Sequence, residues 1–125
     1  MEKSYILIVD RNVGNLSQTA ETIVGMRVKS IEISAHTVAQ KAIDMMKVQK
    51  FALIITNVEI PGMSGFELIE KARELGQDCP VIFQASIVSN SLLHRAKEIN
   101  ATCVSSMGTV NELTDPIKKY LKLNN

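Results

Sequence analysis

The chain has 125 residues, of which 46% are hydrophobic and 22% charged, and its formal net charge is +1. This length and composition predict one globular domain over residues 1–125 and exclude a fibrous or disordered chain. Because basic and acidic residues nearly balance, we expect no strong attraction to nucleic acid or to a membrane surface. The N-terminal apolar run is too short for a signal peptide or a membrane span, so a cytoplasmic location is expected.

The N-terminal half alternates expected strands with expected helices. An apolar run over residues 5–9 predicts a buried strand, and apolar side chains at helical spacing follow over 13–24. Residues 30–34 alternate between apolar and polar, which suits an edge strand, and a second helical stripe follows over 38–46. The run over 51–56 is continuously apolar and predicts a strand that is covered on both faces.

The C-terminal half continues the alternation. A helical stripe over residues 68–75 precedes an apolar strand at 81–85, and another over 92–99 precedes a strand at 102–106. The last amphipathic stretch covers 110–121. Strands and helices that alternate in this way predict an α/β fold, a single doubly wound (βα)5 domain around a parallel sheet.

The last expected helix has distinctive signals at its start. Thr109 with Glu112 three residues later is typical of a capping box. Pro116 lacks a backbone N–H, so a kink or a late start of this helix is expected.

In a doubly wound sheet the ligand site lies beyond the C-terminal ends of the central strands. This rule selects the residues that follow each strand: Asp10, Arg11, Asn12, Asn57, Val58, Glu59, Ala85, Ser86, Met107 and Gly108. The opposite charges of Asp10 and Arg11 cancel, and Glu59 is expected to lie no closer than the rim of the site. A Mg²⁺ site usually needs one or two carboxylates, and the guanidinium would repel a cation. Mg²⁺ binding is therefore expected to be weak or absent, with no other cofactor.

Nucleophilic chemistry has few candidates at these strand ends. The Asn57 amide is not a nucleophile, and the Ser86 hydroxyl lacks an activating base. The histidines, His36 and His94, are expected at or within helices away from the strand ends. The residues alone therefore predict a site where enzymes of this fold have theirs. The site lacks the nucleophile and the activating base that catalysis would need.

Four segments resemble the signature blocks of the response-regulator receiver domain family, in order and at the right separations. They are "ILIVDRNVGNL", "LIITNVEIPGMSGFEL", "PVIFQAS" and "NATCVSSMG". The resemblance covers essentially the whole chain and implies a flavodoxin-like sheet of strand order 2-1-3-4-5. Receivers of this family take a phosphoryl group from a kinase histidine onto an aspartate at the end of the third strand, with Mg²⁺ bound by two acids after the first.

The resemblance places other residues at most of the family's functional positions. The phosphoacceptor position is Asn57, and the acid pair is Asp10 with Arg11. The Ser/Thr, Lys and switch-aromatic positions hold Ala85, Met107 and Val104. The chain therefore resembles a pseudo-receiver that acts by protein contact without aspartyl phosphorylation. Two arrangements of Arg11 stay open: its guanidinium pairs with Asp10 in the place of Mg²⁺, or it extends into solvent.

The resemblance also implies partners and a contact surface. A signalling protein such as a histidine kinase, or an effector domain, is the expected partner, and homodimerisation is a further expectation. The surface would comprise the fourth helix, fifth strand and fifth helix. The residues expected to be exposed there are His94, Arg95, Glu98, Lys118 and Lys122. Two alternatives remain: phosphorylation by an unusual route at Ser86 or Ser64, and a small-ligand sensor at the altered strand-end pocket.

Overall fold

A parallel sheet of five strands forms the centre of the chain, in the order β2-β1-β3-β6-β7. The computed structural model describes residues 3–122. The strands are β1 (Ser4–Val9), β2 (Ile31–His36), β3 (Leu53–Asn57), β6 (Val81–Ala85) and β7 (Thr102–Ser105). Without the short strands β4 and β5 this order is 2-1-3-4-5, so the predicted doubly wound fold is confirmed. The alternating strand β2 lies at the sheet edge, as its sequence predicted.

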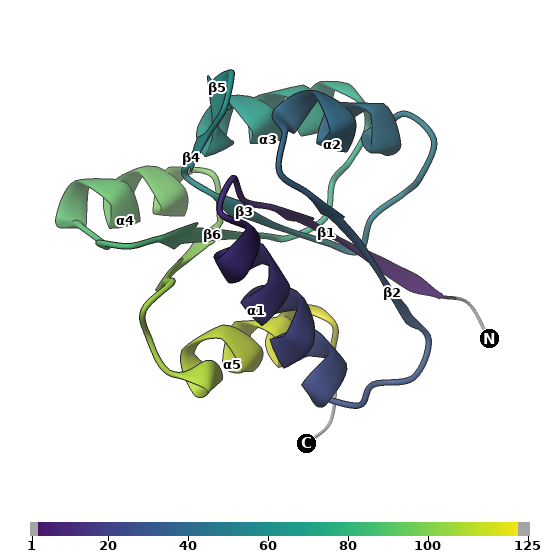
Figure 1. Ribbon diagram of the computed structural model, residues 1–125. Coiled ribbons are helices and arrows are strands. Elements are labelled where there is room, and N and C mark those ends of the chain that lie inside the picture. The colour runs from purple at the N-terminus through teal and green to yellow at the C-terminus, as the bar shows by residue number, and fades with distance from the viewer. Residues whose placement is uncertain (1–2, 123–125) are drawn as a thin grey trace.

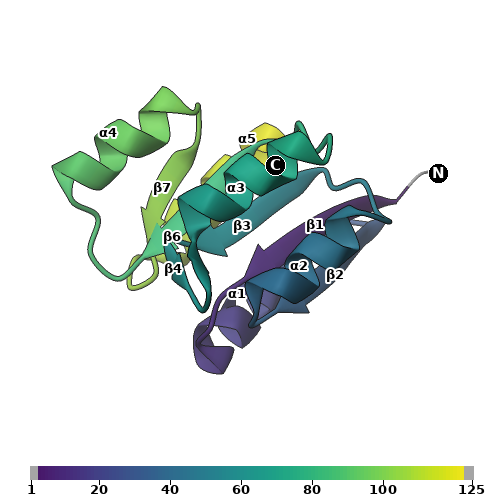
Figure 2. The same cartoon turned by 90° about the horizontal axis from the view of Figure 1, so that it is seen from above.

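Helices cover both faces of this sheet (Figure 1). Within residues 3–122 they are α1 (Val13–Gly25), α2 (Ala39–Met46), α3 (Gly65–Glu74), α4 (Asn90–Glu98) and α5 (Val110–Tyr120). Helices α1 and α5 lie on one face, while α2 and α3 lie on the other, and α4 packs beside β7 (Figures 1 and 2). The five predicted helices are thereby confirmed.

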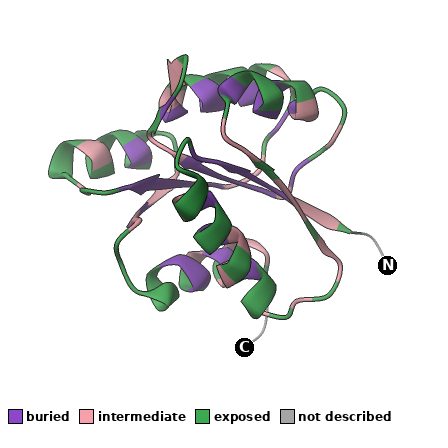
Figure 3. Cartoon of the chain, in the orientation of Figure 1, coloured by how far each residue is buried: buried purple, intermediate pink, exposed green. Residues whose placement is uncertain are grey.

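Alternating side chains of the strands build a separate apolar cluster on each face. Leu7, Ile54 and Phe83 belong to the cluster beneath α2 and α3. Ile8 and Ile82 belong to the cluster on the α1 and α5 side. The central strands β1, β3 and β6 are buried along most of their length (Figure 3), because helices remove both sheet faces from water.

The structure shows where two apolar residues of α1 lie, and it contradicts the late start of the last helix, while the alternative of a kink at Pro116 stays a prediction. Val13 and Val24 share the apolar spacing of α1, yet they are 65% and 68% exposed, because they flank the stripe that faces the sheet. Helix α5 does not start late: it begins at Val110, the Thr109 side chain accepts a bond from Glu112 N, and the helix continues across Pro116. The N-cap therefore determines the start of α5.

A small antiparallel hairpin after β3 was not predicted. Strands β4 (Glu59–Ile60) and β5 (Met63–Ser64) pair around the Pro61–Gly62 turn and lead directly into α3. Gly62 has a φ of 89°, a conformation that favours glycine. The hairpin thus fixes the chain between the end of β3 and the start of α3.

Candidate functional site

A cleft of about 360 Å³ lies at the C-terminal ends of β1, β3 and β6. This is the position that the sheet topology predicted for a ligand site. The residues that line it are Asp10, Arg11, Asn12, Asn15, Asn57, Val58, Glu59, Ala85, Ser86, Ile87 and Ser106. Eight of the ten residues selected from the sequence are therefore brought together, whereas Met107 and Gly108 are not among the lining residues.

Asp10 is the buried acid of this cleft, with 1% of its surface exposed. Its Oδ1 accepts a hydrogen bond from the backbone N–H of Asn12 at 2.9 Å. Its Oδ2 accepts a bond from the Asn57 side-chain nitrogen, Nδ2, at 3.3 Å. Both carboxylate oxygens of Asp10 are consequently bonded to N–H groups of the protein.

Asn57 uses both ends of its amide. Nδ2 donates to Asp10, and Oδ1 accepts from the backbone N–H of Glu59 at 2.9 Å. The second bond spans two residues, which is the geometry of an Asx turn. One asparagine side chain therefore joins the end of β1 to the end of β3 and also begins the β4–β5 hairpin.

The backbone around Asn57 is held closely on both sides. The N–H of Val58 donates to the carbonyl of Gln84 on β6 at 3.1 Å, and the N–H of Gly65 donates to the carbonyl of Val58 at 2.8 Å. A Cβ atom at Gly65 would lie 2.5 Å from the Asn57 carbonyl oxygen. Glycine at the start of α3 is therefore required by close approach of the helix to the strand end.

Arg11 and Glu59 are both exposed at the rim of the cleft. None of the ion pairs among residues 3–122 includes Arg11. The structure therefore does not show the ion pair between Arg11 and Asp10. It shows the alternative arrangement, in which Arg11 is exposed to solvent. The asparagine amide, and not the guanidinium, contacts the Asp10 carboxylate.

The remaining family positions differ in where they lie. Ala85 is buried and Ser86 is exposed, and both line the cleft. Met107 is 83% exposed, and its N–H donates to the Ser105 hydroxyl in a turn that carries its side chain to the surface. Val104, at the switch position, is only 8% exposed and belongs to the apolar cluster beside α5.

The candidate contact residues do not form one uniform surface. Arg95 lies over the Phe66 ring, with its Cζ 4.0 Å from the ring centre, and it lines a groove between α3 and α4 together with Glu98. His94 and Lys122 are exposed, whereas Lys118 is half-buried and was wrongly expected to be exposed. Only the positions of these residues are observed, so their role in contacts stays a prediction.

Neither histidine is among the residues that line the cleft, and the position of one of them was predicted wrongly. His36 ends strand β2, not a helix, and its Nε2 lies 2.7 Å from the Ser34 hydroxyl. Burial, together with the positive charge of Lys41, lowers the pKa of His36 from its ordinary value of 6.5. No cluster of three or more His, Cys, Asp or Glu side chains suited to a metal occurs in the described part of the chain.

Sequence reasoning missed a second polar site beside the cleft. Gln84 on β6 is only 5% exposed, and its Oε1 accepts a hydrogen bond from the Thr19 hydroxyl of α1 at 3.3 Å. A glutamine inside the otherwise apolar run "VIFQA" was the available signal. A buried polar residue of this kind usually has a specific partner.

The fold and the site define a receiver domain. A family model, the response regulator receiver domain, matches residues 6–106. The chain belongs to this family, whose members are signalling domains of two-component systems. Among residues 3–122, no helix is both long and apolar enough to cross a membrane.

Individual relatives agree with this assignment. The chain is 26% identical over 84 residues to sporulation initiation phosphotransferase F of Bacillus subtilis, covering 66% of this chain and 68% of that protein. It is 35% identical over 83 residues to chemotaxis protein CheV3 of Helicobacter pylori, covering 65% of this chain but only 26% of that protein. The chain thus matches only about a quarter of the length of the second relative.

Solved structures share the fold at low sequence identity. A CheY-like receiver domain protein from Methanospirillum hungatei has a TM-score of 0.83 and 22% identity, with 97% of this chain and 95% of that chain covered. The non-phosphorylated HemR receiver domain from Leptospira biflexa has a TM-score of 0.83 and 18% identity, with 98% of each chain covered. These similarities establish the fold.

Proposed function

We propose that this chain is a pseudo-receiver, a receiver domain that signals by protein contact and does not use aspartyl phosphorylation. The bond between Asn57 Nδ2 and Asp10 Oδ2 at 3.3 Å supports this proposal best. In a phosphorylated receiver two carboxylates face each other here, and a divalent cation between them offsets their repulsion. The amide donor removes both the repulsion and the need for the cation.

The donor set does not fit Mg²⁺. The ion demands near-octahedral oxygen ligands and usually one or two carboxylates. Asp10 is the buried carboxylate of the cleft and both its oxygens already accept N–H bonds, while Arg11 adds a positive charge at the rim. Mg²⁺ would compete with these N–H donors for the Asp10 oxygens and would lie close to the positive charge of Arg11. We therefore propose that Mg²⁺ binding is weak or absent.

The phosphoryl-transfer groups are also replaced. An amide nitrogen or oxygen at Asn57 is not an activated nucleophile. Phosphoryl transfer depends on charge stabilisation of the transferred oxygens, yet the lysine position holds Met107, an exposed and uncharged side chain. Ala85, at the hydroxyl position, has no group to donate to a phosphoryl oxygen. Four replaced positions together favour a non-catalytic, constitutive state.

Protein partners are proposed from the relatives. One relative is named as a phosphotransferase of sporulation and another as a chemotaxis protein. A histidine kinase or an effector domain is therefore the proposed partner, and nucleic acid is not. The proposed contact surface is α4–β7–α5, with homodimerisation through the same surface as a further proposal. Its candidate residues are His94, Arg95, Glu98, Lys118 and Lys122.

Mass spectrometry after incubation with acetyl phosphate and Mg²⁺ tests the proposal. We expect the mass to stay unchanged. A gain of about 80 Da, one phosphoryl group, would contradict it, and peptide mapping would then locate the modified residue. Ser86 is exposed in the cleft, whereas the Ser64 hydroxyl already caps α3, so these two sites are distinguishable.

The positive control restores the family's chemistry in the same fold. The variant Arg11→Asp, Asn57→Asp, Ala85→Thr, Met107→Lys carries an acid pair, an acceptor, a hydroxyl and a lysine at the family positions. We expect this variant to gain the phosphoryl mass while the natural chain does not. Equal labelling of both proteins would show that Asn57 and its neighbours do not determine phosphorylation.

A further inference from the structure

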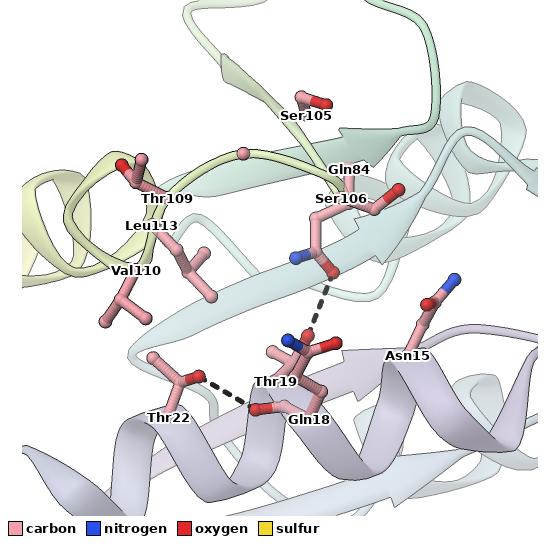
Figure 4. Close-up of a pocket in the computed structure, with 11 residues that line it drawn as sticks. Asn15, Gln18, Thr19, Thr22, Gln84, Ser105, Ser106, Thr109, Val110 and Leu113 are labelled. Atoms are coloured by element: carbon pink, nitrogen blue, oxygen red, sulfur yellow. Dashed lines mark hydrogen bonds between the residues drawn. The ribbon is translucent and has the colours of Figure 1, made fainter.

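A second pocket, of about 40 Å³, lies between α1 and α5. It adjoins the strand-end cleft, because Asn15 and Ser106 line both. Asn15, Gln18 and Thr19 of α1 face Gln84 of β6 across it, and Thr109 closes its far side (Figure 4). The lining consists of carboxamides, hydroxyls, a glycine and two aliphatic side chains. Amides and hydroxyls concentrated at one small pocket suggest recognition of a hydrogen-bonding ligand.

Gln84 has an unused hydrogen-bonding group in this pocket. Its Oε1 accepts from Thr19, whereas no described residue bonds its Nε2. Figure 4 shows the Gln84 side chain reaching from β6 towards α1, with the nitrogen turned away from the Thr19 hydroxyl. Exchanging the nitrogen and oxygen would leave the oxygen unused instead. Either way, one polar atom of a side chain that is 5% exposed is available to a ligand.

Packing does not require a glutamine at this position. Ile82, two residues earlier on the same sheet face, is completely buried among apolar side chains. No buried side-chain nitrogen or oxygen among the described residues lacks a partner, so the unbonded Gln84 Nε2 is open to the pocket. Gln84 Oε1 satisfies the hydroxyl of the buried Thr19, so the group of this side chain without a role inside the fold is Nε2.

The charges around the pocket favour a neutral ligand. None of the lining residues carries a formal charge, so neither a cation nor an anion would find a counter-charge. The positive end of the α5 dipole lies close by, but Glu112 already places its carboxylate against Gly108 in the first turn. An added anion would meet that carboxylate, and a cation would meet the helix N-terminus.

We propose that this pocket binds a small uncharged molecule that carries a carboxamide group. The ligand carbonyl would accept from Gln84 Nε2, and its NH₂ would donate to hydroxyl or carbonyl oxygens of the α1 side chains. A volume of 40 Å³ accommodates roughly three water molecules, which matches a ligand of about four non-hydrogen atoms. The proposal does not depend on whether the chain is phosphorylated.

Titration of the ¹⁵N-labelled chain with acetamide, followed by NMR, tests this assignment. We expect saturable shifts of the Gln84 side-chain NH₂ signals and of the amides of Thr19 and Ser106. Acetate, which has the same shape but a negative charge, should produce no saturable shift at these signals. Shifts that rise linearly with acetamide, or equal saturation by acetate, would overturn the proposal; the pocket would then hold only water.

Two variants localise the binding. Gln84→Met keeps the length of the side chain and removes its amide, and we expect affinity to fall by ~10-fold or more. Thr22→Ile fills the pocket from α1 without touching Gln84, and it should also abolish saturation, so it serves if Gln84→Met does not fold. Gln40→Met, on the exposed face of α2, is the matched control and should bind normally. Undiminished binding in a folded pocket variant would refute the site.

Discussion

At the scale of single residues, the substitution at position 57 changes how two strands meet. The side chain at the end of β3 lies 3.3 Å from a carboxylate oxygen of Asp10, which is 1% exposed. A second carboxylate there would repel the first unless a proton or a cation came between them. An amide bonds the same carboxylate directly. We therefore propose that Asn57 has a structural role at the position that resembles the family's phosphoacceptor.

The variant Asn57→Asp tests this view through stability. We expect the free energy of unfolding to fall by roughly 1–3 kcal/mol at pH 8, because a donor to a buried carboxylate becomes a second negative charge. The loss should be smaller at pH 5, since a shared proton can then replace the lost hydrogen bond. Urea denaturation at both pH values measures this.

A control separates local repulsion from added charge. Asn111→Asp places the same charge on the exposed surface of α5 and should change stability by less than about 0.5 kcal/mol. An equal loss in both variants would mean that the contact with Asp10 contributes little.

Gly65 offers a second prediction at this scale. A Cβ at this position would lie 2.5 Å from the Asn57 carbonyl oxygen and 3.2 Å from the Phe83 ring. Gly65→Ala should therefore destabilise the chain by about 1–3 kcal/mol, although alanine usually favours a helix. Thermal denaturation measures the change. Gly25→Ala, where a Cβ meets nothing within 4 Å, is the control and should not be destabilising.

At the scale of elements, the hairpin and the start of α3 hold the edge of the cleft. Ser64 ends β5 and is also the N-cap of α3. Its hydroxyl accepts from Glu67 N at 3.1 Å, and the Glu67 carboxylate accepts from Ser64 N at 3.0 Å, which completes a capping box. These bonds position the residues beside Asn57, so the cleft depends on a helix start outside its lining.

Ser64→Ala should lower the free energy of unfolding by ~1 kcal/mol, because Glu67 N loses its acceptor at the helix start. Chemical denaturation followed by circular dichroism measures this. Ser86→Ala, an exposed serine outside any helix, should be nearly neutral. If the two variants were equally stable, the capping box would not contribute to the fold.

At the scale of the whole molecule, global stability should depend on pH through His36. Burial beside Lys41 lowers its pKa below 6.5 in the folded state, so the unfolded chain binds its proton more readily. The contribution of neutral His36 to the free energy of unfolding is fully present above pH 6.5. It is lost as the pH falls from 6.5 through the lowered pKa of the folded state. Denaturation from pH 7.5 to pH 5 should show this decline.

Two histidine variants assign the pH dependence. His36→Gln cannot titrate at this position and should flatten the decline between pH 7.5 and pH 5. His94→Gln changes an exposed residue of α4 and is the control. An unchanged decline in His36→Gln would assign the dependence to other groups of the molecule.

The sequence by itself determined the alternation of strands and helices, the edge position of β2 and the site at the strand ends. These features follow from local periodicity and from the direction of parallel strands, which neighbouring residues encode. The resemblance to receivers supplied the strand order and the altered functional positions, including Asn57.

Only the tertiary structure decided which side chains of the site meet. Asn57 and Asp10 are 47 residues apart, and Thr19 and Gln84 are 65 apart, so no local pattern reveals either contact. The exposure of Arg11 and Met107 was likewise beyond the sequence, because it depends on how loops leave the sheet. Periodicity reports which face a residue occupies, whereas hydrogen bonding between distant segments depends on packing of the complete fold.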